Sequence, residues 1–219
     1  MAALRFSRTA LAVASVAALI GTTAPELARA LQKKYDAIKD FSADFVHVYE
    51  GGVLKKQITE RGHLRVKKPG KMRWDYTAPE KVFVSDGVKM YSYIPQEKQV
   101  YVTSVPQGDG ATTPMLFLTG KGDLTRDFTP SLADLPPGLP PGMQALKLVP
   151  KSPQQEYDWL ILAIDPASLT IRGLVTVDAQ GGKSSFSFTN LKENVGLADK
   201  AFAFKIPRGV EVATDSPRR

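Results

Sequence analysis

The side chains that are able to do acid, base or metal chemistry are few in this chain. The sequence holds only two histidines, His47 and His63, and neither has a companion at the spacing of a metal-ligand motif. Cysteine is absent, and no nucleophile elbow, phosphate-binding loop or dinucleotide-binding motif occurs. A glycosidase-like carboxylate pair stays open, among Asp44, Asp75, Asp86, Asp158, Asp165 and Asp178. We therefore expect binding rather than catalysis, with no cofactor and no metal.

The residues best suited to binding lie in the stretch Gly62–Tyr76, which predicts two strands joined by a basic turn. After the break at Pro69–Gly70, Met72, Trp74 and Tyr76 alternate with charged residues. Alternation with a period of two indicates a strand with one apolar and one wet face. The cations of the turn are Lys67, Lys68, Lys71 and Arg73. Two interpretations stay open: an ordinary hairpin with a solvated tip, or the wall and rim of an apolar cavity.

A second apolar segment is predicted to be a short helix from Pro114 to Leu118. Thr113 is a suitable N-cap, Pro114 fits the first helical position, and Gly120 fits the C-terminal stop. The helix is apolar nearly all round, with glycine-rich flanks. That pattern describes a buried connector or a hinged lid over a hydrophobic space, and the residues alone do not separate the two.

The remaining elements predict a mainly β protein with helices at two points. A helix is expected over Leu31–Phe41, and Gly51–Gly52 predicts a short hairpin at the start of an antiparallel meander. The double Pro-Pro-Gly motif within Pro130–Pro153 predicts a stiff surface loop. Alternating aromatic residues in Ala201–Val212 predict a closing strand. In all, nine to eleven strands should form a single antiparallel sheet.

The first thirty residues resemble an export signal. Two arginines precede the apolar stretch Ala10–Ile20, which is too short to span a bilayer as a helix. The sequence Ala28-Arg29-Ala30 has the small-x-small form of a signal-peptidase site, and Ala24 offers another small residue nearby. We expect cleavage near Ala30, with residues 31–219 as a single domain. An N-terminal membrane anchor is the alternative.

Composition sets further limits on compartment and partners. An exported chain without cysteine must be held together by its core, and it has no thiol that could carry a lipid. The net charge of +7 is basic, yet no nucleic-acid-binding motif occurs. We expect a soluble periplasmic monomer with no nucleic-acid partner.

Several motifs together resemble the periplasmic outer-membrane lipoprotein carrier family, LolA. They are FSADF (Phe41–Phe45), GHLRVKKPGKMRWDY (Gly62–Tyr76), VSDGVKMYSY (Val84–Tyr93), TPMLFL (Thr113–Leu118) and FAFKIPRGVEV (Phe202–Val212). They run in family order along nearly all of the expected mature chain. The resemblance implies an unclosed antiparallel β-barrel, or half-barrel, with a helical lid over an apolar cavity.

The resemblance also implies a function and a set of site residues. Such carriers take acylated lipoproteins from an inner-membrane lipoprotein-releasing ABC transporter and pass them to an outer-membrane receptor. The ligand-binding positions of the family fall on Met72, Trp74, Met115, Leu116 and Leu118. An arginine that the family ties to lid closure falls on Lys68, which keeps the charge but lacks the planar guanidinium fork, so Arg73 is considered as a substitute. A sensor of the same fold for lipids or other hydrophobic ligands and an exported hydrolase are the alternatives.

Overall fold

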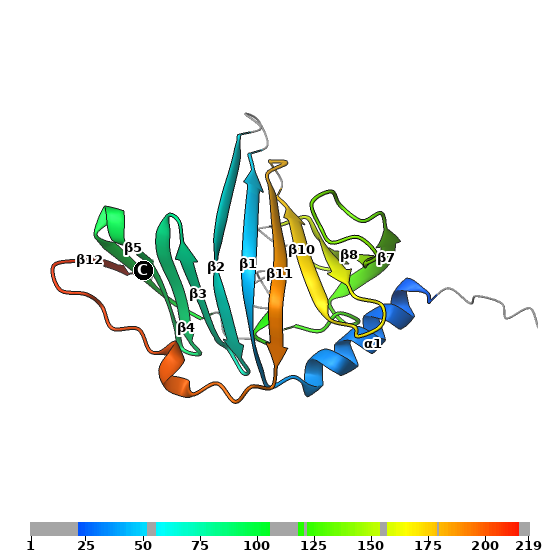
Figure 1. Ribbon diagram of the computed structural model, residues 1–219, viewed down its shortest axis with the longest axis horizontal. Coiled ribbons are helices and arrows are strands. Elements are labelled where there is room, and N and C mark those ends of the chain that lie inside the picture. Colours follow the sequence, from blue (N-terminus) through cyan, green and yellow to red (C-terminus); the bar gives the residue numbers. More distant parts are fainter. Residues whose placement is uncertain are drawn as a thin grey trace, which may run out of the picture.

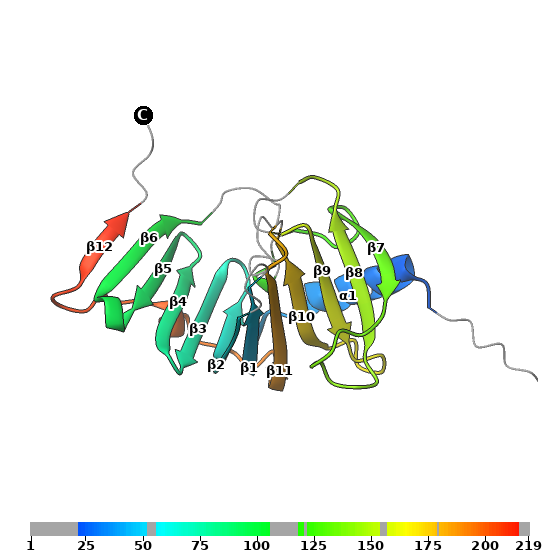
Figure 2. The same cartoon turned by 90° about the horizontal axis from the view of Figure 1, so that it is seen from above.

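The computed structural model describes residues 22–51, 56–105, 118–120, 122–153, 157–178 and 180–214. Among these residues, one curved sheet of twelve strands carries the fold, with strand order β12-β6-β5-β4-β3-β2-β1-β11-β10-β9-β8-β7. The edge strands β12 and β7 lie at opposite ends of the sheet, which stays unclosed (Figures 1 and 2). The elements are α1 (Ala24–Ala37), β1 (Asp40–Glu50), β2 (Gln57–Lys67), β3 (Lys71–Thr77), β4 (Glu80–Asp86), β5 (Lys89–Ile94), η1 (Pro95–Glu97), β6 (Gln99–Ser104), β7 (Phe128–Ala133), β8 (Gln144–Pro150), β9 (Trp159–Ile164), β10 (Ile171–Val177), β11 (Lys183–Glu193), η2 (Asp199–Phe202) and β12 (Glu211–Thr214).

The alternation predicted for β3 is confirmed. Met72, Trp74 and Tyr76 are buried on the face of the sheet that carries the main core, which we call the inner face. On β2, Leu64 pairs with Trp74 and Val66 with Met72, and both β2 residues are fully buried. The opposite, outer face of β3 carries the charged residues. The register of this hairpin therefore follows directly from the period-two pattern.

Helix α1 lies across the inner face, near β7 and β8 (Figure 2). Its side chains Leu27, Leu31 and Tyr35, each four residues from the next, are buried against the sheet. The helix begins at Ala24 because Thr23 and Glu26 form a capping box: the Glu26 carboxylate accepts hydrogen bonds from the Thr23 N–H (2.9 Å) and hydroxyl (2.7 Å).

The expected boundaries of this helix, Leu31 and Phe41, need correction. The structure starts it seven residues earlier, at Ala24, and ends it at Ala37, because Ile38 adopts an extended conformation. Phe41 belongs to β1, where its ring is buried on the inner face. The apolar stripe alone indicated the helix, whereas the cap that sets its start lies in the part of the sequence that resembles an export signal.

The outer face of β8–β10 carries a small second core formed by the proline-rich loop. Leu139, between the two Pro-Pro-Gly motifs, packs against β9 and β10. A Cβ at Gly173 would lie 2.6 Å from a Leu139 methyl carbon, so this glycine makes room for the loop. The predicted loop is therefore confirmed for the proline-rich residues themselves. Pro130, however, lies in strand β7, at the edge of the sheet, where a missing N–H is tolerated.

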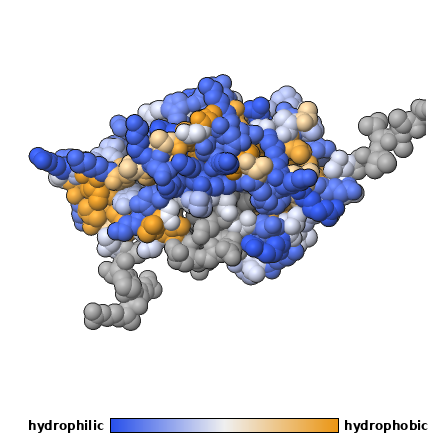
Figure 3. All heavy atoms as spheres, turned by 90° about the horizontal axis from the view of Figure 1, so that it is seen from below, coloured by the Kyte–Doolittle hydropathy of each residue, from blue (hydrophilic) through white to orange (hydrophobic). Residues whose placement is uncertain are grey.

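The C-terminal segment differs from the predicted closing strand. Phe202 lies in η2, and its side chain is fully buried. Phe204 packs against Tyr91 and Tyr93 of β5, with ring centroids 5.4 and 5.9 Å away. Only Glu211–Thr214 forms a strand, which pairs in parallel with β6 and is the one exception to antiparallel pairing among the described strands. Seen from below, hydrophobic surface gathers toward the β12 end of a largely hydrophilic face (Figure 3).

Candidate functional site

A small apolar cavity of about 20 Å³ lies between α1 and the inner face of the sheet. Helix α1 contributes Leu31 and Tyr35 to its wall, Ile38 follows directly after the helix, and Leu118 lies beside them. The sheet side of the wall consists of Phe41, Leu169, Ile171, Phe188 and Leu191. Its lining is almost wholly hydrophobic, as in a lipid site, but as it stands the cavity has room for only about one water molecule, so a lipid chain would need α1 or the sheet to move aside.

Among the described residues of the cavity wall, the charged ones are Lys34 and Glu193, which form an ion pair. Lys34 of α1 lies 2.8 Å from a carboxylate oxygen of Glu193 at the end of β11. The same ammonium donates hydrogen bonds to the Ser168 carbonyl and the Thr170 hydroxyl, each at 2.9 Å. These contacts fix the last turn of α1 to the loop between β9 and β10, and the rest of the described wall is apolar.

A cluster of aromatic rings extends from this cavity along the inner face. Phe188, which lines the cavity, has its ring centroid 6.5 Å from that of Trp74. Trp74 in turn makes edge contacts with Phe45 (4.9 Å) and Phe186 (5.4 Å). Phe45 also contacts Tyr76 at 4.8 Å. The indole N–H of Trp74 is buried and has no hydrogen-bond acceptor among the described residues.

Three of the five predicted ligand-binding residues can be placed in or beside this site. Trp74 is central to the aromatic cluster, and Met72 lies on the same inner face of β3. Leu118 lines the cavity and is 3% exposed. Met115 and Leu116, with most of the predicted lid helix, lie outside the described residues. Sequence reasoning missed the contribution of β10 and β11, because nothing local marks which strands lie beneath α1.

Lys68 connects three separate segments, and we call these contacts the Lys68 clasp. Its ammonium donates a hydrogen bond to the backbone carbonyl of Tyr35 in the last turn of α1 and lies 3.6 Å from the centroid of the Tyr35 ring. Its methylenes pass beneath Gly120, where a Cβ would lie 2.9 Å from the Lys68 Cδ. Gly120 also has a φ of +84°, so this position favours glycine on both grounds.

Further hydrogen bonds support the clasp. The Tyr35 hydroxyl donates to the Leu118 carbonyl (2.5 Å), and the Gly70 N–H donates to the Thr119 carbonyl (3.2 Å). Burial lowers the pKa of Lys68 to about 8, while the carboxylate of Asp36 acts in the opposite direction. Burial also raises the pKa of the Tyr35 hydroxyl well above its usual value. The clasp thus holds the end of α1 and residues 118–120 against the β2–β3 turn.

The other cations of the predicted basic tip have different roles. Arg73 lies on the outer face, where its Nε is 2.8 Å from a carboxylate oxygen of Asp75, which Arg65 also contacts at 2.6 Å. This places Arg73 on the wrong side of β3 to replace Lys68 in a contact with α1. Lys67 and Lys71 both form ion pairs with Asp199 of η2, at 2.6 and 3.0 Å.

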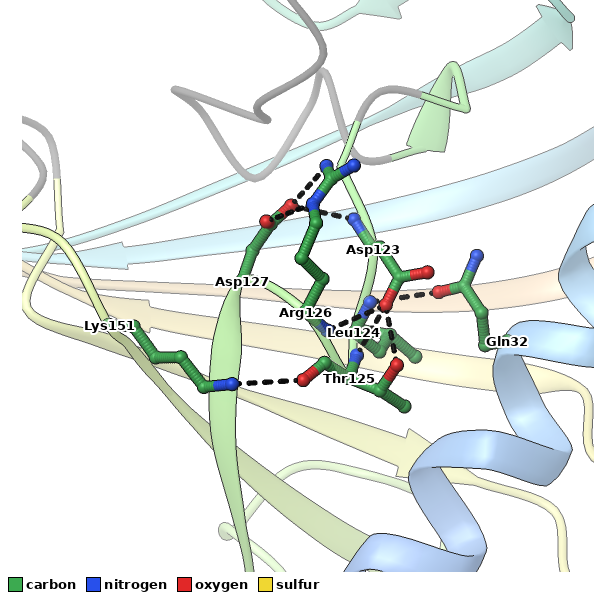
Figure 4. Close-up of polar contacts among 7 residues, drawn as sticks. All are labelled: Gln32, Asp123, Leu124, Thr125, Arg126, Asp127 and Lys151. Carbon is green, nitrogen blue, oxygen red and sulfur yellow. Dashed lines mark hydrogen bonds and ion pairs between the residues drawn. The ribbon is translucent and has the colours of Figure 1, made fainter.

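The chain that follows Leu118 is anchored to α1 by a compact polar turn (Figure 4). The backbone N–H of Leu124 donates to the side-chain carbonyl of Gln32 at 2.9 Å. Asp123 accepts hydrogen bonds from backbone N–H groups that follow it, including that of Arg126 (2.7 Å). The Arg126 guanidinium binds Asp127 and holds the pKa of that carboxyl below its usual value. This turn attaches residues 123–127 to α1.

A buried polar cluster at the other end of the aromatic rings was not foreseen. His47 stacks on Phe186, with centroids 4.1 Å apart, and lies 3.3 Å from Glu60, which Lys81 contacts at 2.7 Å. Burial lowers the pKa of His47, so the ring is neutral near pH 7. The register between β1 and β2 brings this cluster together, because it places His47 opposite Glu60. In the same register Glu50 pairs with Gln57, so the turn between the two strands is longer than Gly51–Gly52 predicted. The polar side chains of this cluster are hydrogen-bond partners of one another.

Neither histidine belongs to a metal site in the described part of the chain. His63 lies 2.5 Å from Asp44, which also accepts a hydrogen bond from Asn190, on the outer face. No group of three or more histidine, cysteine or carboxylate side chains that could hold a metal ion occurs among the described residues. None of the described helices is long and apolar enough to cross a membrane.

Comparison with known proteins yields one consistent family. The family model described as outer membrane lipoprotein carrier protein LolA matches residues 36–205. The outer-membrane lipoprotein carrier protein of Methylococcus capsulatus is 32% identical over 186 residues, which cover 84% of this chain and 86% of that protein. Its counterpart in Chromohalobacter salexigens is 31% identical over 215 residues, covering 95% of this chain and 98% of that protein.

Among solved structures, a LolA superfamily protein from Nitrosomonas europaea matches 81% of this chain and 97% of its own, with 13% identity and a TM-score of 0.43. The family-model match covers most of the chain, including β1 to β6 and the whole cavity wall formed by the sheet. Together with the identity to the curated carriers, it shows that the chain belongs to the outer-membrane lipoprotein carrier family, LolA.

Proposed function

We propose that this protein is a periplasmic carrier that binds the acyl chains of lipoproteins in the cavity beneath α1. It would accept them from an inner-membrane ABC transporter and deliver them to an outer-membrane receptor. The observation that carries the proposal is the apolar cavity between α1 and β10–β11, in a chain of this family. The curated relatives are named as outer-membrane lipoprotein carriers, and such carriers work in the periplasm.

The energetics of acyl binding fit a cavity with a releasable cover. Burying a sixteen-carbon chain yields roughly 12 kcal/mol gross, at about 0.8 kcal/mol per methylene. An apolar cavity able to take up that chain would be an aggregation surface if it stood open. A cover that must be displaced offsets part of the binding free energy and lets the cargo leave again. Helix α1 and residues 118–120 cover the cavity, and we propose that the Lys68 clasp controls their opening.

We further propose that export removes the N-terminal segment and leaves α1 intact from Pro25 onward. A cut after Ala30 would remove Leu27 and Ala28, which are 2% and 0% exposed, together with the capping box at Thr23. A cut at or before Ala24, where Thr22 and Ala24 are small residues two apart, leaves Leu27 and Ala28 in the core, although a cut directly after Ala24 also removes Thr23 of the capping box. Intact mass measurement of the periplasmic protein should give a first residue no later than Pro25, and a chain beginning at Leu31 would refute this site.

Depletion of the protein in its own cell tests the carrier role. Outer-membrane lipoproteins should then accumulate in the inner-membrane fraction, because nothing shields their acyl chains across the periplasm. Re-expression of the wild-type protein is the control and should restore sorting. Normal distribution of lipoproteins after depletion would contradict the proposal and favour a sensor or a hydrolase.

A further inference from the structure

The indole N–H of Trp74 is the one buried side-chain polar atom without a hydrogen-bond partner in the described part of the chain. Trp74 is 3% exposed, and the rings around it belong to Phe45, Phe186 and Phe188. A buried indole N–H ordinarily finds an acceptor, since leaving it unpaired costs free energy that burial of the ring does not require. A phenylalanine would pack against the same rings without an unpaired donor, at the expense of some lost volume. The unpaired donor therefore points to an acceptor that arrives with a ligand.

The groups around Trp74 limit which kind of acceptor could pair with its indole N–H. The rings that contact Trp74 offer no oxygen, and a hydrocarbon chain offers none either. Trp74 lies next to the cavity, since Phe188 belongs both to the cavity wall and to the rings around Trp74. A ligand that fills the cavity and extends along the inner face brings the polar end of its acyl chain toward the indole. That end is a carbonyl, in an ester or an amide.

We propose that Trp74 donates a hydrogen bond to the carbonyl oxygen of an acyl linkage in the bound lipid, and so distinguishes acylated cargo from plain hydrocarbon. The inference rests on the proposed carrier function and deepens it, because it assigns a specificity-determining contact to a residue otherwise seen as cavity wall. The neighbouring polar groups do not compete for this role: Glu60 is paired with Lys81 and His47, and Lys34 with Glu193.

The chain contains two tryptophans, Trp74 and Trp159, which makes the test direct. The mature protein labelled with ¹⁵N at tryptophan gives two indole signals, and Trp74→Phe assigns them. The probes are a diacylglyceryl lipopeptide with two palmitoyl esters and its dialkyl ether analogue, which has the same chains without the ester carbonyls. The Trp74 indole proton should shift downfield with the ester probe only. Trp159 packs under Lys147 on the outer face and should not respond.

Affinity supplies the second readout. Trp74→Phe should weaken binding of the ester probe about tenfold, the value of one hydrogen bond at the upper end of the usual range, and change binding of the ether probe less than about twofold. Trp159→Phe is the matched control and should leave both affinities unchanged. Equal losses for the two probes, or the same indole shift with both, would overturn the proposal. If the wild-type protein binds neither probe, the proposed carrier function itself is contradicted. If Trp74→Phe does not fold, the indole shift of the wild-type protein with the two probes decides whether Trp74 bonds to the carbonyl.

Discussion

Lys68 shows how one side chain ties separate parts of the fold together. Its ammonium reaches the end of α1, its methylenes lie under Gly120, and its backbone N–H donates to the Lys39 carbonyl at 2.8 Å. An arginine at this position would carry a permanent charge, whereas lysine can lose its proton. The partial burial that lowers the pKa of Lys68 to about 8 thus gives the clasp a dependence on pH.

The sign of that dependence follows from the pKa shift. Between about pH 8 and the ordinary value of 10.5, the unfolded chain holds a proton that the folded chain has released. Deprotonation there favours the folded state, so this contribution grows with rising pH and is lost as the pH falls through 8. The free energy of unfolding of the wild type, relative to Lys68→Met, should rise by on the order of 1 kcal/mol from pH 7.5 to 9.5, after allowance for solvent screening.

Urea unfolding of both proteins at several pH values measures this difference. The comparison with Lys68→Met cancels the titration of the other lysines, and the upper limit of pH 9.5 stays below the titration of Tyr35, whose pKa is raised by burial. Lys68→Arg is the second control, and its difference from Lys68→Met should stay constant, because arginine keeps its proton. A wild-type difference that is equally constant would show that Lys68 is not desolvated.

Gly62 is a second position where a single residue decides local packing. Lying opposite Phe45 in the β1–β2 pair, it lets the aromatic ring cross the strand, and an added Cβ would lie 2.7 Å from the ring and 2.1 Å from the Asp75 carbonyl oxygen. Gly62→Ala should lower the free energy of unfolding by about 3 kcal/mol or more, as an overpacked core does. Gly51→Ala is the matched control, since its nearest neighbours would be 3.9 Å away. Equal urea midpoints for the two variants would contradict the packing described for Phe45.

At the scale of the element, α1 is a cover that is attached at several points along its length. Lys34 binds Glu193, Gln32 accepts from the Leu124 N–H, and Tyr35 is held by the Lys68 clasp. All of these contacts lie in the second half of the helix. Its first half is held mainly by burial of apolar side chains and by its cap. The first half therefore contributes to the core, and the second half is attached by hydrogen bonds and an ion pair.

Shortening the chain at its N-terminus tests the contribution of the first half of α1. A chain that starts at Leu31 lacks Leu27 and the capping box, which together stabilise the fold by about 3 kcal/mol on ordinary values for a buried leucine and an N-cap. A chain that starts at Thr22 keeps both and serves as the control. The Leu31 chain should therefore unfold at a lower urea concentration. If the two chains unfold at the same midpoint, the first half of α1 does not contribute to the core.

The elements also show where prediction from sequence succeeds. The apolar face of β3 followed from residues 72–76 alone, since a two-residue period has one interpretation for a half-buried strand. The start of α1 was missed because its cap lies within a segment whose composition indicates export. The β1–β2 register was missed because the glycine pair suggested a tighter turn than the observed pairing of Glu50 with Gln57. The first error could have been corrected from local pattern, since Thr23 and Glu26 have the spacing of a capping box, whereas the second depends on the pairing of two strands.

At the scale of the whole molecule, an unclosed sheet provides a curved inner face, part of which α1 covers. The family motifs identified the fold and pointed to Met72 and Trp74, but they could not reveal that α1, β10 and β11 enclose the cavity. Those contacts join residues more than a hundred positions apart in sequence, such as Lys34 and Glu193. The clasp is of the same kind: Lys68 was recognised by motif, and its partner Tyr35 only by the structure.

Native mass spectrometry of the protein purified from the periplasm, together with a co-expressed outer-membrane lipoprotein, tests the central claim most directly. We expect a one-to-one complex whose mass includes the acyl chains of the lipoprotein. Replacing the acylated cysteine of that cargo by alanine removes the lipid, and the complex should then disappear. A complex that forms equally well with the non-acylated cargo, or no complex with the acylated one, would contradict the assignment of the cavity beneath α1 as an acyl-binding site.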